Sequence, residues 1–264
     1  MLINDKFIYF DLQKTGSSHM IKILSQLPSL NSTVLGKHAL YHTIPEDLVS
    51  DFQSILKIGT IRNPWDWYVS IWAFGCLGRG GLHYRLTKVP KLSSYSGMKE
   101  FLFHSSRRRE WKRLYKDSFN PELFRGWLKN LLIEKKTDFK EGYNESPISD
   151  FAGLVTFLFL KIYSYDFLKK SADITDFNKL TEFDKENNFI DIMLKTETLH
   201  TSLIENAENM GISVKEMKDT LKKMVEKTNK SMRNNYHFYY DEETAELVKQ
   251  KEKFLIEKYN YSFD

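Results

Sequence analysis

Apolar and polar positions follow one another along this chain in patterns that separate short strands from helices. Residues Phe7 to Leu12 form an apolar run, which is typical of a strand covered on both faces of a parallel sheet. Further strands are predicted at Val34 and Leu35, at Ile55 to Ile61 and at Phe189 to Leu194. Because helical patterns alternate with these strands, the sequence predicts an α/β fold with a mainly parallel sheet.

Helical periodicity follows the predicted strands. The first helix carries Met20, Ile21 and Leu24 on one face and ends at Pro28. The second is expected to begin after a capping Asn63, with Pro64 at its first position and Asp66 in its first turn. Three more helices are predicted towards the carboxyl end, over residues 198–210, 214–225 and 247–255.

The middle of the chain has a different pattern. Residues 77–98 are rich in glycine, serine and basic side chains and are predicted to form a loop or lid. Residues 99–170 tend towards helix without a regular apolar face, which indicates an insertion. We therefore expect a single domain over residues 1–264, with a loop and a helical insertion over residues 77–186.

Composition narrows the class of protein. With 264 residues, 41% hydrophobic and 28% charged, the chain can bury a sizeable core and is not expected to be disordered. Its formal charge of +4 is compatible with anionic ligands but too small to indicate nucleic acid. Cys76 is the only cysteine, so neither an intramolecular disulfide nor a multi-cysteine metal site can form within one chain. The apolar stretch Phe151 to Leu160 is too short to span a bilayer, and the first predicted strand starts too early for a signal peptide, so a soluble cytoplasmic protein is expected.

The stretch QKTGSS, Gln13 to Ser18, lies between the first strand and the first helix. Ser17 or Ser18 is expected to cap the helix, and Gly16 allows a close turn that leaves backbone N–H groups free to bind an anion. Lys14 adds a positive charge that can follow negative charge on a leaving oxygen. The alternative is an ordinary strand-to-helix turn with a capping serine. The pattern G-x-x-x-x-G-K-[ST] is absent, which counts against a nucleoside triphosphatase.

A second polar pair follows the strand at Ile55 to Ile61. In RNPWDWYVS, Arg62 stands at the strand end and Ser70 in the second turn of the next helix, where both can reach one phosphate. Alternatively, Arg62 pairs with an acidic residue and Ser70 only packs the helix. Open α/β sheets bind ligands at the carboxyl ends of their strands, so two such sites fit a ligand with two separated phosphate groups.

These two motifs together resemble the sulfotransferases that use 3′-phosphoadenosine 5′-phosphosulfate (PAPS). Gln13 to Ser18 is similar to the 5′-phosphosulfate loop of that family, and Arg62 to Ser70 is similar to its 3′-phosphate motif. The resemblance covers residues 6–75 well and residues 187–264 loosely. It implies a three-layer α/β/α, P-loop-NTPase-like fold and transfer of a sulfuryl group to a hydroxyl or amine, with PAP as product and without a metal. Residues 77–186 would then form the acceptor side.

The resemblance also implies roles for individual residues. Lys14 would assist departure of the bridging oxygen, and the backbone and hydroxyls of Thr15, Gly16, Ser17 and Ser18 would hold the 5′-phosphate and sulfonate. Arg62 and Ser70 would hold the 3′-phosphate. His19 occupies the position of an aromatic residue near the adenine, the alternative being an exposed helix residue. Lys230 and Arg233 would close over the nucleotide, although the G-x-x-G-x-W-K version of this segment is absent and a solvated charge pair is the alternative.

The general base is left open between three residues. Family members place a histidine after the second strand, and GKHALYHTIPEDL offers His38 and His42. We prefer His38 because it lies closest to the strand end, and a neutral imidazole suits proton transfer near pH 7. Glu197 matches a glutamate of the family and is a base, a substrate contact or a cap for the following helix. The H-x-x-x-H spacing could hold a metal on a helix, but Pro45 and the strand end make a helix unexpected there.

Other function classes also remain open. One alternative is a nucleotide kinase or NTPase of related fold, and another is a non-catalytic PAP-binding relic that binds an acidic partner. The basic run Arg107 to Arg109 would serve an acidic acceptor, or nucleic acid together with Trp111, unless it is a solvated helix face. A small-molecule, glycan or lipid-type hydroxyl acceptor is expected, with no nucleic acid and no membrane span; the acceptor itself and the oligomeric state are not encoded in any pattern found.

Overall fold

The computed structural model describes residues 1–49, 51–88, 107–134, 142–224 and 232–264. The chain divides into two compact units. Unit 1 comprises Met1–Asn63, Leu158–Ile174 and Asn178–Lys230, and unit 2 comprises Pro64–Phe157, Thr175–Phe177 and Ser231–Asp264. The predicted insertion of residues 77–186 therefore coincides with neither unit.

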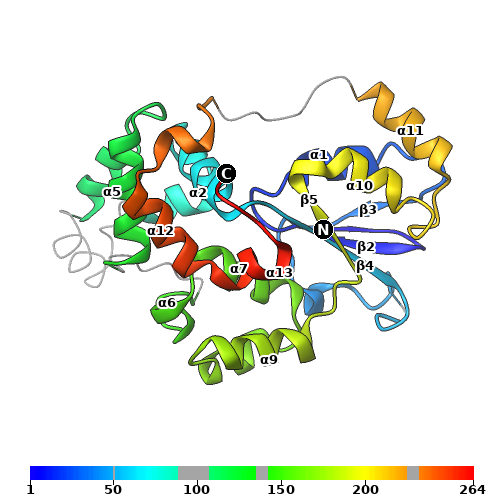
Figure 1. Ribbon diagram of the computed structural model, residues 1–264. Helices are drawn as coiled ribbons and strands as arrows, with labels where there is room; N and C mark the ends of the chain where they lie inside the picture. Colours follow the sequence, from blue (N-terminus) through cyan, green and yellow to red (C-terminus); the bar gives the residue numbers. More distant parts are fainter. Residues whose placement is uncertain (50, 89–106, 135–141, 225–231) are drawn as a thin grey trace, which may run out of the picture. The chain divides into compact units, whose positions relative to one another are not determined.

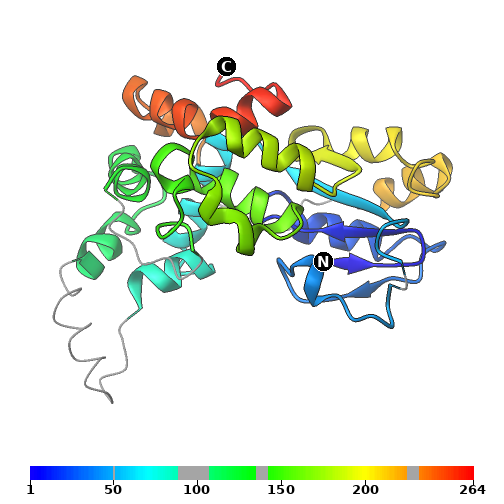
Figure 2. The same ribbon diagram turned by 90° about the horizontal axis from the view of Figure 1, so that it is seen from below.

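Unit 1 contains a five-stranded sheet in the order β3-β1-β2-β4-β5. Its parallel part consists of β2 (Phe7–Phe10), β4 (Leu56–Ile61) and β5 (Ile192–Lys195). Figure 2 shows β2 and β4 side by side. The α/β fold is confirmed, but the sheet is mixed rather than mainly parallel, because β1 (Leu2–Ile3) runs antiparallel to both β2 and β3 (Thr33–Val34).

The antiparallel edge arises from a tight turn at the start of the chain. The side-chain oxygen Oδ1 of Asn4 accepts hydrogen bonds from the backbone N–H groups of Lys6 and Phe7, each at 2.9 Å. This turn returns the chain directly along β1, and only an antiparallel pair can be joined by so short a connection. A two-residue strand carries no periodicity, which is why the sequence pattern did not predict it.

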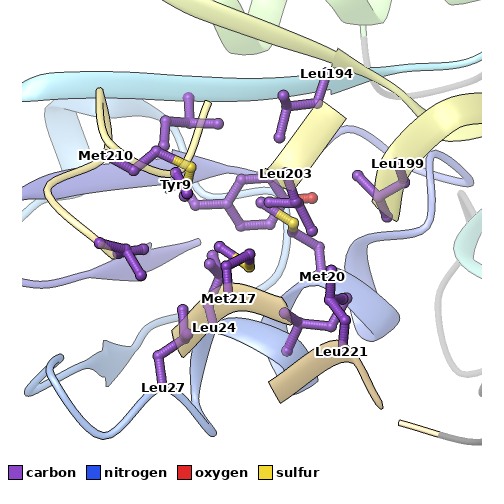
Figure 3. Packing of buried hydrophobic residues seen from close by; sticks show 14 of the residues in the cluster. Tyr9, Met20, Leu24, Leu27, Leu194, Leu199, Leu203, Met210, Met217 and Leu221 are labelled. Atoms are coloured by element: carbon purple, nitrogen blue, oxygen red, sulfur yellow. The ribbon is translucent and has the colours of Figure 1, made fainter. Parts of the chain in front are cut away.

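Helices cover one face of the sheet in unit 1. They are α1 (Ser17–Leu24), α10 (Leu199–Glu205) and α11 (Val214–Lys223), as Figure 1 shows. Their apolar faces meet the strands in one buried cluster, in which the ring of Tyr9 lies among Met20, Leu203 and Met217 (Figure 3). This core holds the amino-terminal end of α1 against the sheet, next to the turn that precedes it.

The opposite face of the sheet is covered by aromatic side chains. Phe10 of β2 contacts the rings of Phe52 and Phe189. Tyr163, at the end of α7 (Leu154–Tyr163), donates its hydroxyl to the carbonyl of Thr60 at 2.8 Å, and its ring lies against Gly59. Unit 1 also contains the short η1 (Tyr41–Thr43), α8 (Phe167–Lys170), η2 (Ser171–Asp173), η3 (Thr196–Thr198) and most of α9 (Phe177–Asn187).

Unit 2 is helical in its described residues. Its elements are α2 (Pro64–Cys76), α3 (Gly81–Thr87), a helix over residues 107–114, α5 (Pro121–Leu132), α6 (Ile148–Phe151), the first residues of α7, η4 (Tyr236–Tyr239), α12 (Glu242–Lys251) and α13 (Lys253–Tyr259). Trp72, Phe124 and Tyr239 are fully buried and contact one another edge to face. The prediction of a loop over residues 77–98 is wrong for α3, whereas residues 89–98 lie outside the described ranges. No described helix has the length and apolar character needed to cross a membrane.

Candidate functional site

The carboxyl ends of the three parallel strands meet at one edge of the sheet in unit 1. The guanidinium of Arg62, directly after β4, donates from Nη1 to the backbone carbonyl of Lys14 at 3.0 Å. The hydroxyl of Thr196, directly after β5, lies 3.0 Å from the carbonyl of Thr15 and 2.9 Å from that of Ile61. The turn at residues 13–18 is therefore tied to the ends of both neighbouring strands.

The turn itself has a left-handed backbone at two positions. Lys14 has a φ of 62° and Gly16 a φ of 78°. Gly16 is the N-cap of α1 and no side chain caps the helix, so the prediction that Ser17 or Ser18 caps it is wrong. Both serines lie in the first helical turn. Within the described ranges, the N–H groups of Gly16, Ser17 and Ser18 donate to no oxygen of the protein, which leaves a set of donors at the positive end of the helix dipole.

Thr15 points into the core rather than towards this set of donors. Its hydroxyl donates to the carbonyl of Leu12 at 2.8 Å and lies 2.7 Å from the hydroxyl of Thr60, which in turn lies 2.9 Å from the hydroxyl of Tyr9. Because the carbonyl can only accept, Thr60 donates to Thr15 and Tyr9 donates to Thr60. Burial raises the pKa of Tyr9 well above its ordinary value, which keeps this donor protonated. The hydroxyl of Thr15 is therefore used by the fold and does not belong to the set of donors at the start of α1.

The left-handed conformation of Gly16 predicts a measurable cost for Gly16→Ala. A Cβ would have room, since its nearest neighbour would be Cγ2 of Thr196 at 3.5 Å, but the φ of 78° disfavours any L side chain. The free energy of unfolding of unit 1 is expected to fall by about 1–2 kcal/mol, measured by urea titration with far-UV circular dichroism. Gly36→Ala is the control, because Gly36 has open space and an ordinary φ; an equal loss in both variants would contradict the explanation.

The structure places His38 beside the end of β2. Its backbone N–H donates to Oδ1 of Asp11 at 3.0 Å, and its ring nitrogen Nδ1 lies 2.8 Å from the backbone carbonyl of Asp11. Asp11 precedes Lys14 by three residues and its side chain is fully buried, whereas the side chain of His38 is 29% exposed. A partly exposed imidazole therefore stands at the strand end from which the 13–18 turn starts.

The other two candidates for a general base have different surroundings. His42 lies in η1, is exposed and contacts the ring of Tyr41. The carboxylate of Glu197 accepts the backbone N–H of Asn63 at 2.7 Å, just before α2 begins. The expectation that Glu197 caps the following helix is wrong, because the N-cap of α10 is Thr198 and no side chain donates or accepts there.

His19 is buried, so its interpretation as an exposed helix residue is wrong. Its Nε2 lies 2.8 Å from Nε2 of His200, and the two rings stack at a centroid distance of 5.2 Å. One of the two nitrogens donates and the other accepts. This pair joins the first turn of α1 to α10. The ring of His19 stacks on the ring of His200, and the predicted stacking on an adenine stays a prediction.

Three predicted nucleotide contacts belong to unit 2 or lie outside the described residues. Ser70 is buried in the second turn of α2. Arg233 forms an ion pair with Asp66 in the first turn of α2, and the side chain of Arg233 is 13% exposed. Lys230 lies outside the described ranges.

The basic run is part of a helix over residues 107–114. Arg107 and Arg109 are exposed, as are Lys112 and Arg113, but Arg108 is buried. Trp111 is also buried, so the idea that it contacts nucleic acid is wrong. The exposed part of the run fits a solvated basic face.

Among the described residues, no group of three or more histidine, cysteine, aspartate or glutamate side chains is arranged to hold a metal ion. Comparison with protein-family models, curated proteins and solved structures finds no match to this chain.

Two residues of this edge were not found from the sequence. Asp11 interrupts the apolar run Phe7 to Leu12 directly after β2, and an acidic residue inside an apolar run is a signal for a buried partner. Thr196 has no comparable signal, because a threonine after a strand is common and its two carbonyl contacts come from distant parts of the chain.

Proposed function

We propose that this protein is a sulfotransferase that moves a sulfuryl group from PAPS to a hydroxyl or amine acceptor. The observation that carries the proposal is the hydrogen bond from the Arg62 guanidinium to the Lys14 carbonyl, since it joins the two motifs in which the resemblance consists. Support also comes from the unused N–H groups of Gly16, Ser17 and Ser18 at the start of α1, where a helix binds anions. A P-loop-NTPase-like relationship of the fold is part of this proposal.

Each residue has one task in the proposal. The N–H groups of Thr15 to Ser18 and the two serine hydroxyls hold the 5′-phosphate and sulfonate, while Lys14 neutralises charge on the leaving phosphate oxygen. Arg62 supplies positive charge for the 3′-phosphate. The assignments of Ser70, His19, Lys230 and Arg233 stay predictions of the sequence.

His38 is the proposed general base. Because Nδ1 faces a carbonyl oxygen, it carries the ring proton, and Nε2 then holds the lone pair that accepts a proton. The acceptor oxygen forms a bond to sulfur while the bond between sulfur and the bridging oxygen breaks. The electron pair of that bond stays on the 5′-phosphate of PAP, and the acceptor proton passes to Nε2 of His38.

Calorimetry with PAP tests the nucleotide site. The unmodified protein is expected to bind PAP with a micromolar dissociation constant, about −8 kcal/mol. Lys14→Ala and Arg62→Ala are each expected to weaken binding at least about tenfold, since each removes one positive charge from a phosphate group. Lys22→Ala is the matched control, because Lys22 is an exposed lysine in the last turn of the same helix α1. Absence of saturable PAP binding by the unmodified protein would end the proposal.

Transfer itself is measured with ³⁵S-labelled PAPS and a defined acceptor panel: 4-nitrophenol, a primary alkyl alcohol, a chitin oligosaccharide and an alkylamine. Labelled product from one class identifies the acceptor chemistry. Tight PAP binding without any transfer would favour a non-catalytic relic that binds an acidic partner through its basic face. Magnesium-dependent hydrolysis of ATP would favour a nucleotide kinase or NTPase. The single cysteine suits a reducing compartment, and we propose the cytoplasm as the location.

A further inference from the structure

We propose that Asp11 is the positioning residue of His38: it fixes the tautomer and the backbone of that histidine and stabilises the imidazolium that forms during transfer. The proposal rests on the proposed function, in which His38 is the general base. It is carried by three contacts between two residues that are 27 positions apart in the chain.

Two of these contacts hold His38 in place, one at its backbone N–H and one at its ring. Oδ1 of Asp11 accepts the backbone N–H of His38 at 3.0 Å, and the backbone carbonyl of Asp11 accepts Nδ1–H of the ring at 2.8 Å. His38 has a φ of 56°, a left-handed conformation that costs free energy for a residue with a side chain. The bond to Asp11 holds the backbone in this conformation and directs the ring back onto the strand end.

The third contact concerns charge. Oδ2 of Asp11 is buried, has no hydrogen-bond partner in the described part of the chain, and lies 3.2 Å from Nδ1 of His38. Oδ1 also accepts the α-amino group of Met1 at 2.5 Å, so only Oδ2 is directed at the imidazole. A carboxylate oxygen at this distance attracts the positive charge that the ring gains when Nε2 takes a proton.

An asparagine at position 11 tests this arrangement with little change in shape. Oδ1 must remain an oxygen, because the α-amino group and the N–H of His38 both donate to it. The amide nitrogen then takes the place of Oδ2 and presents a donor to Nδ1. Nδ1–H still donates to the backbone carbonyl of residue 11, so the tautomer is kept, and what the substitution removes is the negative charge 3.2 Å from the ring.

The test combines nuclear magnetic resonance with kinetics on the whole chain, purified through a carboxyl-terminal tag because the α-amino group of Met1 contacts Asp11. Long-range ¹H–¹⁵N correlation of ¹⁵N-histidine protein at pH 8.5, assigned with His38→Gln, should show His38 protonated at Nδ1. In Asp11→Asn the same tautomer should be kept, because the backbone carbonyl of residue 11 still accepts Nδ1–H. The proposal is overturned if the His38 ring of the wild-type protein is protonated at Nε2. This measurement needs no variant, so the test still decides if Asp11→Asn does not fold.

Kinetics supply a second readout, with the labelled PAPS assay and the best acceptor of the panel. Asp11→Asn should lower kcat about tenfold or more, because the imidazolium loses its anionic neighbour, and should leave the PAP dissociation constant within about twofold, because the nucleotide contacts are elsewhere. In a His38→Gln background, the same change should cost almost nothing further, since the two residues act as a unit. Equal losses in both backgrounds would show a merely structural role. If the unmodified protein neither binds PAP nor transfers, the sulfotransferase proposal fails, whereas an Asp11→Asn enzyme with unchanged kcat defeats only this inference.

Discussion

Replacing His38 by alanine is expected to slow sulfuryl transfer by about 10²- to 10⁴-fold, the usual contribution of a general base. In the proposed mechanism, Nε2 of this ring takes the acceptor proton, and an alanine offers no group that can do so. The PAP dissociation constant should stay within about threefold, because the proposal assigns the phosphates to the 13–18 turn and Arg62 rather than to the base. Turnover is followed with labelled PAPS and affinity by calorimetry.

His42→Ala is the matched control for this prediction. His42 lies four residues further along the chain, is exposed, and contacts only the ring of Tyr41 among the interactions that the structure shows for it. Its replacement should leave both turnover and PAP affinity unchanged. An active His38→Ala enzyme would remove His38 as base, and a large loss in His42→Ala instead would transfer the role to that residue.

The secondary structure of unit 1 could be predicted where several residues repeat a pattern. The strand at Phe7, the strand ending at Ile61 and the helix that begins at Pro64 all appear where periodicity and helix-start signals placed them. The hairpin of β1 could not be predicted, because two residues have no period. One predicted helix over residues 247–255 is divided at Glu252 into α12 and α13, since that side chain turns inward instead of continuing the apolar face.

The site could be predicted only as far as strand topology determines it. Because parallel strands end at one edge, the neighbourhood of Lys14 and Arg62 followed from the sequence, and their hydrogen bond is found. What a side chain does within that edge depends on partners far along the chain. The hydroxyl of Thr15 is used by Thr60, the ring of His19 by His200, and the guanidinium of Arg233 by Asp66. None of these partners can be read from local spacing.

A buried carboxylate in unit 2 gives the largest expected effect on stability. Glu252 is fully buried, and its two oxygens accept four donors: the hydroxyl of Tyr68, the N–H of Val155, and both the N–H and the hydroxyl of Thr156. Val155 and Thr156 lie in the first turn of α7, where backbone N–H groups have no helical partner. Glu252 therefore caps the amino-terminal end of α7, although it lies about a hundred residues further along the chain.

Glu252→Gln is expected to destabilise unit 2 by about 1–3 kcal/mol at pH 8, because each carboxylate oxygen faces one backbone N–H. An amide nitrogen placed on either side would meet a donor and leave that N–H buried without an acceptor. All five tryptophans, Trp65, Trp67, Trp72, Trp111 and Trp127, belong to unit 2, so urea unfolding followed by tryptophan fluorescence reports on this unit. Glu242→Gln, an exposed glutamate in α12, should be close to neutral.

The difference between wild type and Glu252→Gln should also depend on pH. Burial raises the pKa of Glu252 to about 7, against the lowering effect of its hydrogen bonds to Thr156 and Tyr68. Since the folded state then binds the proton more tightly than the unfolded state, this contribution to stability is complete below the unfolded pKa of 4.5 and is lost as pH rises through about 7. The advantage of wild type over Glu252→Gln should therefore grow by about 2–3 kcal/mol from pH 8 to pH 5. A difference that is constant over this range would mean that the four donors keep the carboxylate ionised against the effect of burial, and the direction of the shift would be wrong.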